Sequence, residues 1–431
     1  MSLIPSYRAL IEHCYYENDF PEEFIDQILK NGICTIKENS IKFNVTGILI
    51  YNNTLLILFP KAYKIPESEQ SLLEHIQTLF QVLIKYKREA DLSPEEMELL
   101  GGDRGARDNK LMSAYRLIQD FTQNGLLMKE MRVKTSANIG KTDWPETIAK
   151  KQPMFSGGSV VYIELRSRKT TMDRQHLLLK LHKYCLFLSL KKYGILFSLT
   201  PEDVEIEEIQ LDIDINQAVN VLKNELNSTF IEREINVINM MIDFLLGIRT
   251  NKVNERVEVL ATPYFQNVWE QVCGSIFNNQ YRVLKPIIPN LNWEIESTAV
   301  VQPQRPDVMT IKGDVLFILD AKYYNIETNL PGWSDVVKQL FYAVTIFKHI
   351  NSEEFRFKEL KLLKSIPVIR KVENAFLFPS GDIQPIKYVG KVNIEGNKEF
   401  DDIKAFRINT FLAMKCYLGK EEYPFLEKLT K

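Results

Sequence analysis

Cysteine is scarce in this chain, and the five that occur are scattered: Cys14, Cys34, Cys185, Cys273 and Cys416. Their number is odd and no two stand in C-x-x-C spacing, which argues against a disulfide scaffold and a cysteine-based zinc site. Long apolar runs are also missing, since the stretches at 47–51 and 55–59 fall far short of the roughly 20 residues that a membrane helix needs. The first residues show no secretory signal pattern. We therefore expect reduced cysteines, no membrane association and a cytoplasmic location.

An excess of charge of one sign is missing as well. The 54 lysines and arginines nearly balance 56 aspartates and glutamates, which leaves a net charge of −2. Either the protein has no nucleic-acid partner or its basic surface is local. The five histidines form no H-E-x-x-H metalloprotease pair, and no G-x-S-x-G nucleophile motif occurs.

The N-terminal part of the chain reads as helix followed by strands. Residues 6–30 suit helices, and residues 41–59 suit two strands joined by a turn at 51–54. Residues 68–88 carry apolar side chains at helical spacing. A glycine-rich break follows at 101–105.

The rest of the chain changes character after a polar run at 249–256, which is the best candidate domain boundary. Helical patterns precede it at about 173–192 and 214–248. We therefore expect an α+β N-terminal region over 1–250, with a further break near 95–108 left open. An α/β domain over 251–431, with a central mixed sheet flanked by helices, should follow.

The most informative pattern lies in residues 305–322. Asp307 begins one short strand, Gly313 and Asp314 supply a turn, and an apolar run leads to Asp320 and Lys322. Such a hairpin brings Asp307 and Asp320 together. Because residues i and i+2 of a strand point to the same face, Asp320 and Lys322 should project together while Ala321 turns into the packing.

Two carboxylates and an ammonium at the end of a buried strand are costly without a compensating partner. A divalent cation would compensate the carboxylates, and Mg²⁺ prefers hard oxygen ligands, water and substrate phosphates. Such a cation polarises a scissile phosphate and lowers the pKa of a bound water. Lys322 would then position that water or stabilise developing negative charge.

This arrangement resembles the signature of the PD-(D/E)xK nuclease superfamily, with Pro306, Asp307, Asp320 and Lys322 at the matching positions. The resemblance implies a restriction-endonuclease-like domain that hydrolyses DNA with Mg²⁺, for which Mn²⁺ could substitute. It also implies metal ligation by Asp307, Asp320 and the backbone carbonyl of Ala321.

Further residues gain a role only through that resemblance. Glu270, on a preceding helix, stands where many such nucleases place another catalytic acid and metal ligand. Gln339 and Tyr342 stand where a following helix often contributes auxiliary residues, and they share one helical stripe with Asp335. Each also has a simpler structural interpretation. Glu270 could be an exposed helix residue, and Gln339 and Tyr342 could be core or capping residues. Tyr323 and Tyr324 would pack or contact the DNA backbone.

A narrower resemblance covers much of the chain. The pattern from Trp269-Glu270 to Gln339-Leu-Phe-Tyr342 is similar to the McrC and LlaJI nuclease subunits, with weaker echoes at 58–61, 140–148 and 161–164. The resemblance implies a restriction subunit that works on DNA with an AAA+ GTPase similar to McrB. Self-association through the nuclease domain is left open.

The chain itself is not expected to bind a nucleotide. Gly140-Lys141-Thr142 matches the end of a P-loop, but Thr135 replaces the first glycine and no buried strand leads into the segment. The motor would therefore be another protein.

Two basic clusters in the N-terminal half are candidates for phosphate contacts, although a solvated basic face explains them equally well. The main candidates are Lys129, Arg132, Lys134, Arg166, Arg168 and Lys169.

Two other functions fit the same residues. One is a non-catalytic DNA-binding or assembly subunit with a vestigial nuclease fold. The other is a nuclease that acts in repair or on RNA, because the signature does not distinguish these substrates. The intact set of Asp307, Asp320 and Lys322 disfavours the vestigial alternative, since a relic has no physical reason to keep so costly a cluster.

Overall fold

The computed structural model describes residues 6–52, 54–102, 110–135, 141–173, 177–251, 257–295, 298–353, 355, 367–396 and 401–429. These residues belong to two compact units, one within 104–255 and the other combining 5–103 with 256–431. The second unit holds the predicted nuclease motif.

The second unit begins with strands rather than with the helices expected over 6–30. Its N-terminal elements are β1 (Ser6–Ile11), β2 (Tyr15–Glu17), α1 (Glu22–Lys30), β3 (Cys34–Lys37), β4 (Ser40–Phe43), β5 (Thr46–Tyr51), β6 (Thr54–Phe59), α2 (Glu69–Glu89) and α3 (Pro94–Leu99). The helical expectation is correct for α1 and wrong for residues 6–11, which pair in parallel with β6. The predicted strand pair around 51–54 is confirmed as the β5–β6 hairpin.

Strand β12 (Glu258–Thr262) joins the two sequence-distant halves of this unit, because it pairs antiparallel with β5. The resulting sheet has the order β1-β6-β5-β12. Gly47 allows the close approach, since a Cβ at this position would lie 2.3 Å from the carbonyl oxygen of Leu260. Residues 5–103 therefore fold with the C-terminal part, which differs from the expected division at 250.

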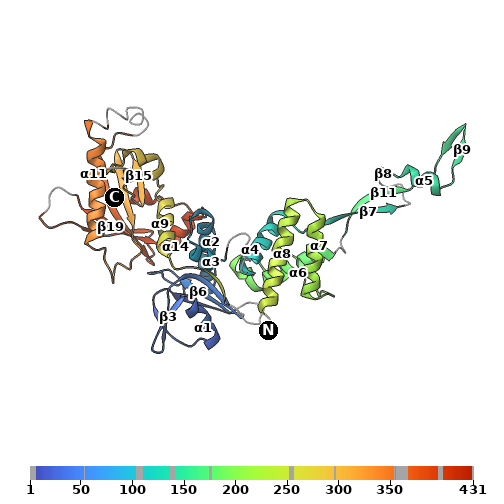
Figure 1. The fold of residues 1–431 in the computed structure, drawn as a ribbon, viewed down its shortest axis with the longest axis horizontal. Helices are drawn as coiled ribbons and strands as arrows, with labels where there is room; N and C mark the ends of the chain where they lie inside the picture. Colours follow the sequence, from blue (N-terminus) through green and yellow to red (C-terminus); the bar gives the residue numbers. More distant parts are fainter. Residues whose placement is uncertain are drawn as a thin grey trace. The chain divides into compact units, whose positions relative to one another are not determined.

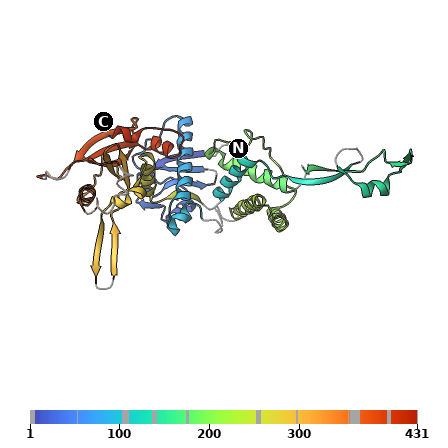
Figure 2. The ribbon, with the colours of Figure 1, turned by 90° about the horizontal axis from the view of Figure 1, so that it is seen from above.

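The C-terminal part of the unit is an α/β structure around a five-stranded mixed sheet of order β15-β16-β17-β19-β18, as predicted. Its strands are β15 (Val308–Lys312), β16 (Val315–Ala321), β17 (Lys371–Ser380), β18 (Ile386–Val392) and β19 (Ile403–Asn409). Strand β16 is antiparallel to β15 and parallel to β17. A separate hairpin, β13 (Asn290–Ile295) and β14 (Thr298–Pro303), stands off from the sheet (Figure 2).

Helices cover both faces of this sheet (Figure 1). They are α9 (Phe265–Ile276), α10 (Tyr281–Leu284), the 3₁₀ turn Lys285–Ile287, α11 (Trp333–Ile350), α14 (Thr410–Tyr417) and α15 (Phe425–Lys428). On the α11 side, Leu316 and Ile318 of β16 pack in one core cluster with Ile346 of α11. Alternate residues of β16 therefore face α11.

The described part of the first unit consists of a group of helices and an arm built mainly of strands. Its elements are α4 (Lys110–Asn124), β7 (Lys129–Thr135), β8 (Lys141–Thr142), α5 (Trp144–Lys150), β9 (Met154–Ser156), β10 (Ser159–Val161), β11 (Ser167–Asp173), α6 (Leu177–Tyr193), the 3₁₀ turn Gly194–Leu196, α7 (Ile215–Ser228) and α8 (Glu232–Asn251). Strands β7 and β11 pair antiparallel, and the chain segment that connects them contains α5, β9 and β10 (Figure 1).

The helical pattern expected over 214–248 is divided into α7 and α8 at residues 229–231. Thr229 is extended, and its hydroxyl accepts a hydrogen bond from the N–H of Ile231 and donates to Glu234 at 2.5 Å. Threonine favours such local bonds over a helix interior. Among the described helices of both units, none is long and apolar enough to cross a membrane.

Candidate active site

The predicted hairpin is confirmed, and it brings the two aspartates together. Asp307 directly precedes β15, and Val308 pairs with Leu319 of β16. Gly313 supplies the positive φ of 64° that the turn requires. The N–H of Ala321 donates to a carboxylate oxygen of Asp307 at 3.0 Å, which holds Asp307 beside Asp320.

Asp320 and Lys322 project from the same side of the strand end. Both continue the alternate positions of Leu316 and Ile318, so they face the helix α11. Ala321 is buried. The N–H of Lys322 donates to the carbonyl of Leu377 at 2.9 Å, which extends the pairing of β16 with β17 as far as Lys322.

Two carboxylates hold the Lys322 ammonium. Its Nζ lies 2.7 Å from Asp320 and 2.8 Å from Asp335. Asp335 is fixed in turn at the start of α11, where it accepts a hydrogen bond from the N–H of Gly332 at 3.2 Å. Burial lowers the pKa of Lys322, but the two carboxylates outweigh it, and the net pKa is raised. Lys322 is therefore a cation at neutral pH.

Asp307 is the carboxyl group that this environment perturbs most. Burial and the neighbouring Asp320 and Glu270 raise its pKa to about 8, although the N–H of Ala321 works in the opposite direction. Its carboxyl group also hydrogen-bonds with Asp320. Like charges this close disfavour the ionisation of both carboxyl groups, so Asp307 holds its proton more tightly than a free aspartate.

Glu270 lies on α9 and keeps an exposed side chain. Loss of solvent around its carboxyl group and the charge of Asp320 raise its pKa, whereas Arg305, Lys322 and Lys338 lower it. Glu270 therefore belongs to the electrostatic surroundings of the site. Its role as a further metal ligand remains a prediction.

The residues present fit a hydrated divalent cation better than a closed protein cage. In the part of the chain that the structure describes, no three His, Cys, Asp or Glu side chains form a ready metal site. The Asp307–Asp320 pair alone suits Mg²⁺, which commonly takes one or two carboxylates and completes its shell with water and phosphate. A cation would also neutralise the repulsion that raises the Asp307 pKa.

The two auxiliary candidates are buried and hydrogen-bond to main-chain oxygens. Gln339 donates to the carbonyl of Ile318 at 2.8 Å, two residues before Asp320. The hydroxyl of Tyr342 is 3.5 Å from the carbonyl of Arg305. Both contacts hold the main chain at or next to the hairpin in place. That either residue affects the reaction remains a prediction.

Sequence reasoning placed Asp335 on the helical stripe but did not assign it to Lys322. It also missed Asn279, whose side chain donates to the carbonyl of Asp307 at 2.8 Å and accepts from the N–H of Met309 at 3.1 Å. Asn279 thus fixes the start of β15. An asparagine in the polar loop after α9 carried no signal of this contact.

The basic clusters lie in the arm of the first unit. Arg168 pairs with Asp143 at 2.5 Å, Lys150 pairs with Glu146 at 3.0 Å, and Lys151 pairs with Glu164. The Arg166 main chain bonds to Asp143 and Thr147. These pairs compensate part of the positive charge.

Several predictions for the arm concern residues or side chains outside the part of the chain that the structure describes. They concern the side chains of Lys129, Arg132, Lys134 and Lys169, and residue Gly140 of the rejected P-loop.

Comparison with known proteins assigns the chain to a family. A family model of LlaJI restriction endonucleases matches residues 45–411, which span both units. The chain belongs to the LlaJI restriction endonuclease family. The match supports the resemblance to LlaJI seen in the sequence and places the chain among restriction-system proteins.

Two known proteins are similar to this LlaJI-family chain over almost its whole length. The type II restriction enzyme BsuMI component YdjA of Bacillus subtilis (strain 168) is 24% identical over 460 residues, covering 97% of this chain and 92% of YdjA. McrC, bound to the McrB AAA+ hexamers of Thermococcus gammatolerans, is similar at 14% identity with a TM-score of 0.41. That alignment covers 98% of this chain and 100% of McrC.

Proposed function

We propose that this LlaJI-family protein is the DNA-cleaving subunit of its restriction system and that it hydrolyses phosphodiester bonds with Mg²⁺ at the PD-(D/E)xK-like hairpin. The observation that carries the proposal is the convergence of Asp307, Asp320 and Lys322 at one strand end. The family membership supports DNA as the substrate, which the signature alone does not distinguish from RNA.

The chain's own residues would bind the cation and hold the phosphate. Asp307 and Asp320 would provide carboxylate oxygens, and a bound cation would supply positive charge that polarises the scissile phosphate and acidifies water. Asp307 must lose its proton when the cation binds.

Lys322 would stabilise charge rather than accept a proton. Its ammonium is held by Asp320 and Asp335, so it is unsuited to act as a base at neutral pH. Once a cation occupies Asp320, Asp335 would still anchor Lys322 beside the scissile phosphate. Arg305 and Lys338, both exposed near Glu270, are positioned to meet neighbouring phosphates.

The nuclease proposal is tested by plasmid cleavage with wild type, Asp320→Ala and Lys322→Ala, in Mg²⁺ or in EDTA. We expect cleavage by wild type only, and only with Mg²⁺, while both variants still bind DNA. Cleavage by either purified variant at the wild-type rate would contradict the proposal. The vestigial alternative predicts DNA binding without cleavage under every condition.

We also propose an AAA+ GTPase similar to McrB as the partner, with the arm as its docking surface. The end of the arm exposes a group of large apolar side chains: Trp144, Ile148, Met154, Phe155, Val160 and Ile163. Phe155 is 79% exposed. Exposed apolar groups in such number are typical of protein interfaces, whereas the charges of Lys150, Lys151 and Arg168 are paired with carboxylates.

The partner proposal is tested by GTP-stimulated cleavage after addition of an AAA+ GTPase similar to McrB. Phe155→Ser should abolish the stimulation, because it removes apolar contact area without affecting the nuclease site. Ile383→Ser is the matched control, since Ile383 is also largely exposed but lies in the other unit. Equal stimulation of both variants would rule out this docking surface.

A further inference from the structure

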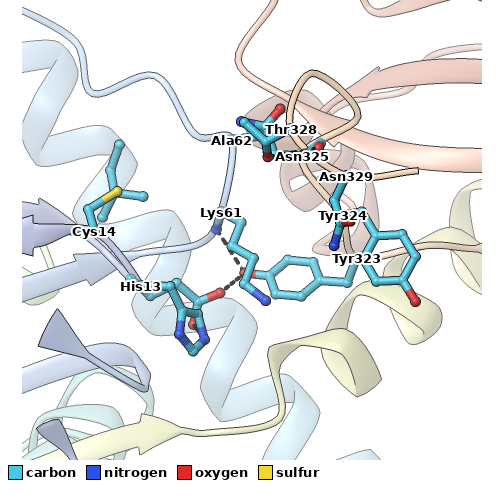
Figure 3. Close-up of a pocket in the computed structure, with 11 residues that line it drawn as sticks. His13, Cys14, Lys61, Ala62, Tyr323, Tyr324, Asn325, Thr328 and Asn329 are labelled. Atoms are coloured by element: carbon cyan, nitrogen blue, oxygen red, sulfur yellow. Dashed lines mark hydrogen bonds and ion pairs between the residues drawn. The ribbon is translucent and has the colours of Figure 1, made fainter. Parts of the chain in front are cut away.

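The strand end that carries Lys322 is held from its opposite side by Tyr323. Successive residues of a strand point to opposite faces, so Tyr323 turns away from α11. The Tyr323 side chain is buried, its hydroxyl donates to the carboxylate of Glu12, and it accepts a hydrogen bond from the N–H of Lys61 at 2.9 Å (Figure 3).

Both partners of Tyr323 come from the N-terminal sheet. Glu12 directly follows β1, and Lys61 comes two residues after the end of β6. Because β1 and β6 run parallel, their ends meet at one edge, where the N–H of Glu12 donates to the carbonyl of Phe59 at 2.9 Å. The N-terminal sheet therefore contacts the nuclease strand directly after Lys322.

This contact is polar although it is buried. The Glu12 side chain is only 1% exposed, and besides Tyr323 it has the His13 ring at 3.9 Å. The Lys61 ammonium lies over the Tyr323 ring, 4.8 Å from its centre. A buried carboxylate costs more than an apolar side chain of similar volume, so stability alone does not explain it. Directional hydrogen bonds provide a defined position instead.

The same sheet also determines where α9 begins. Strand β12 pairs with β5 and leads through two residues into α9, which carries Glu270. Phe265, the first residue of α9, packs against Tyr323 with ring centres 5.5 Å apart. Tyr323 therefore joins the end of β16, which carries Asp320, to α9, which carries Glu270.

We propose that Tyr323 and Glu12 are positioning residues that fix the end of β16, and with it Lys322 and Asp320, for phosphodiester hydrolysis. This inference rests on the proposed nuclease function and assigns part of the N-terminal sheet to it. Loss of the Tyr323–Glu12 hydrogen bond releases the backbone at residues 321–323. The Asp320 carboxylate and the Lys322 ammonium then spend less time in the geometry that hydrolysis requires.

The test compares Tyr323→Phe with Tyr417→Phe. Tyr417 is a matched control, because it is also a buried residue and its hydroxyl also donates to a glutamate, Glu89, at 3.1 Å. We expect Tyr323→Phe to lower kcat about ten-fold with KM nearly unchanged, since small displacements of reacting groups are costly. Tyr417→Phe should leave kcat unchanged. A kcat of Tyr323→Phe equal to that of wild type would overturn the inference.

A double variant separates positioning from folding. Glu12→Leu combined with Tyr323→Phe removes both the hydroxyl and the carboxylate of the Tyr323–Glu12 hydrogen bond. The double variant should therefore recover stability towards urea relative to Tyr323→Phe alone, in which the Glu12 carboxylate is left buried without this donor. Its kcat should stay low, because an apolar contact lacks the direction of a hydrogen bond. Recovery of kcat together with stability would show a purely structural role.

Hydrogen exchange gives a readout that does not require cleavage. In Tyr323→Phe the amides of residues 321–324 should exchange faster than in wild type, and in Tyr417→Phe they should not. If wild type failed to cut DNA, the proposed function would fall, while faster exchange would still establish the Tyr323 contact. Amide exchange at residues 321–324 that is the same in Tyr323→Phe and wild type would overturn the positioning role of Tyr323, whatever the cleavage activity.

Discussion

Asp307→Asn should make the metal-free protein more stable while it removes a residue of the proposed active site. Asp307 has a pKa raised to about 8, against an ordinary value of 3.8, because it is partly buried and lies beside Asp320. Between these two pH values the folded chain keeps a proton that the unfolded chain has lost. Stability therefore falls as pH rises through this window.

The magnitude follows from the pKa difference. At pH 7 the unfolded carboxyl group is about 3 pH units above its pKa, so keeping the folded group protonated costs about 4 kcal/mol at most. Asparagine carries no charge and retains an oxygen that can accept from the N–H of Ala321. We expect Asp307→Asn to stabilise the protein by about 2 kcal/mol, since solvent and local rearrangement relieve part of the cost.

The assay is urea unfolding at pH 7 in EDTA and again in Mg²⁺. Asp314→Asn is the matched control, because Asp314 lies in the same hairpin but is exposed in the turn. Wild type should gain stability from Mg²⁺, and Asp307→Asn should not, since it lacks one proposed ligand. If Asp307→Asn were less stable than wild type in EDTA, the account of the carboxylate pair would be refuted.

Three further variants test other parts of the structure. Asp335→Asn should lower the cleavage rate about ten-fold with little loss of stability, because Lys322 loses one of its two carboxylates; an unchanged rate would exclude Asp335 as its anchor. Gln339→Leu should destabilise the protein by about 1–2 kcal/mol in urea unfolding, since it deprives the carbonyl of Ile318 of its side-chain donor. Burial lowers the pKa of His182 to about 4, so wild type should lose up to about 3 kcal/mol of stability as pH falls from 6.5 to 4. His182→Gln should lack this loss, and parallel pH profiles of the two proteins would disprove it.

The sequence predicted the hairpin of the proposed active site because its signals are local. Asp307, the Gly313 turn and the apolar run to Asp320 lie within 14 residues, and strand periodicity alone places Asp320 and Lys322 on one face. The helical stripe that contains Asp335 was visible for the same reason. The ion pair of Asp335 with Lys322 could not be predicted, because this pair depends on where α11 packs on the sheet.

Contacts between distant segments had no comparable signal. Glu12 and Tyr323 are separated by 311 positions, and no periodicity relates β1 to β16. Residues 6–11 were expected to be helical because the apolar pattern of a short segment does not distinguish helix from edge strand. Pairing with β6, a tertiary contact, determines the outcome.

The most direct test of the account is Mg²⁺-dependent cleavage of DNA by Asp307→Asn, measured beside Asp314→Asn and wild type in the presence of the partner and GTP. We predict that Asp314→Asn cuts at the wild-type rate and that Asp307→Asn does not cut, although it is the more stable protein. Cleavage by Asp307→Asn at the wild-type rate would contradict the assignment of this carboxylate pair as the nuclease centre.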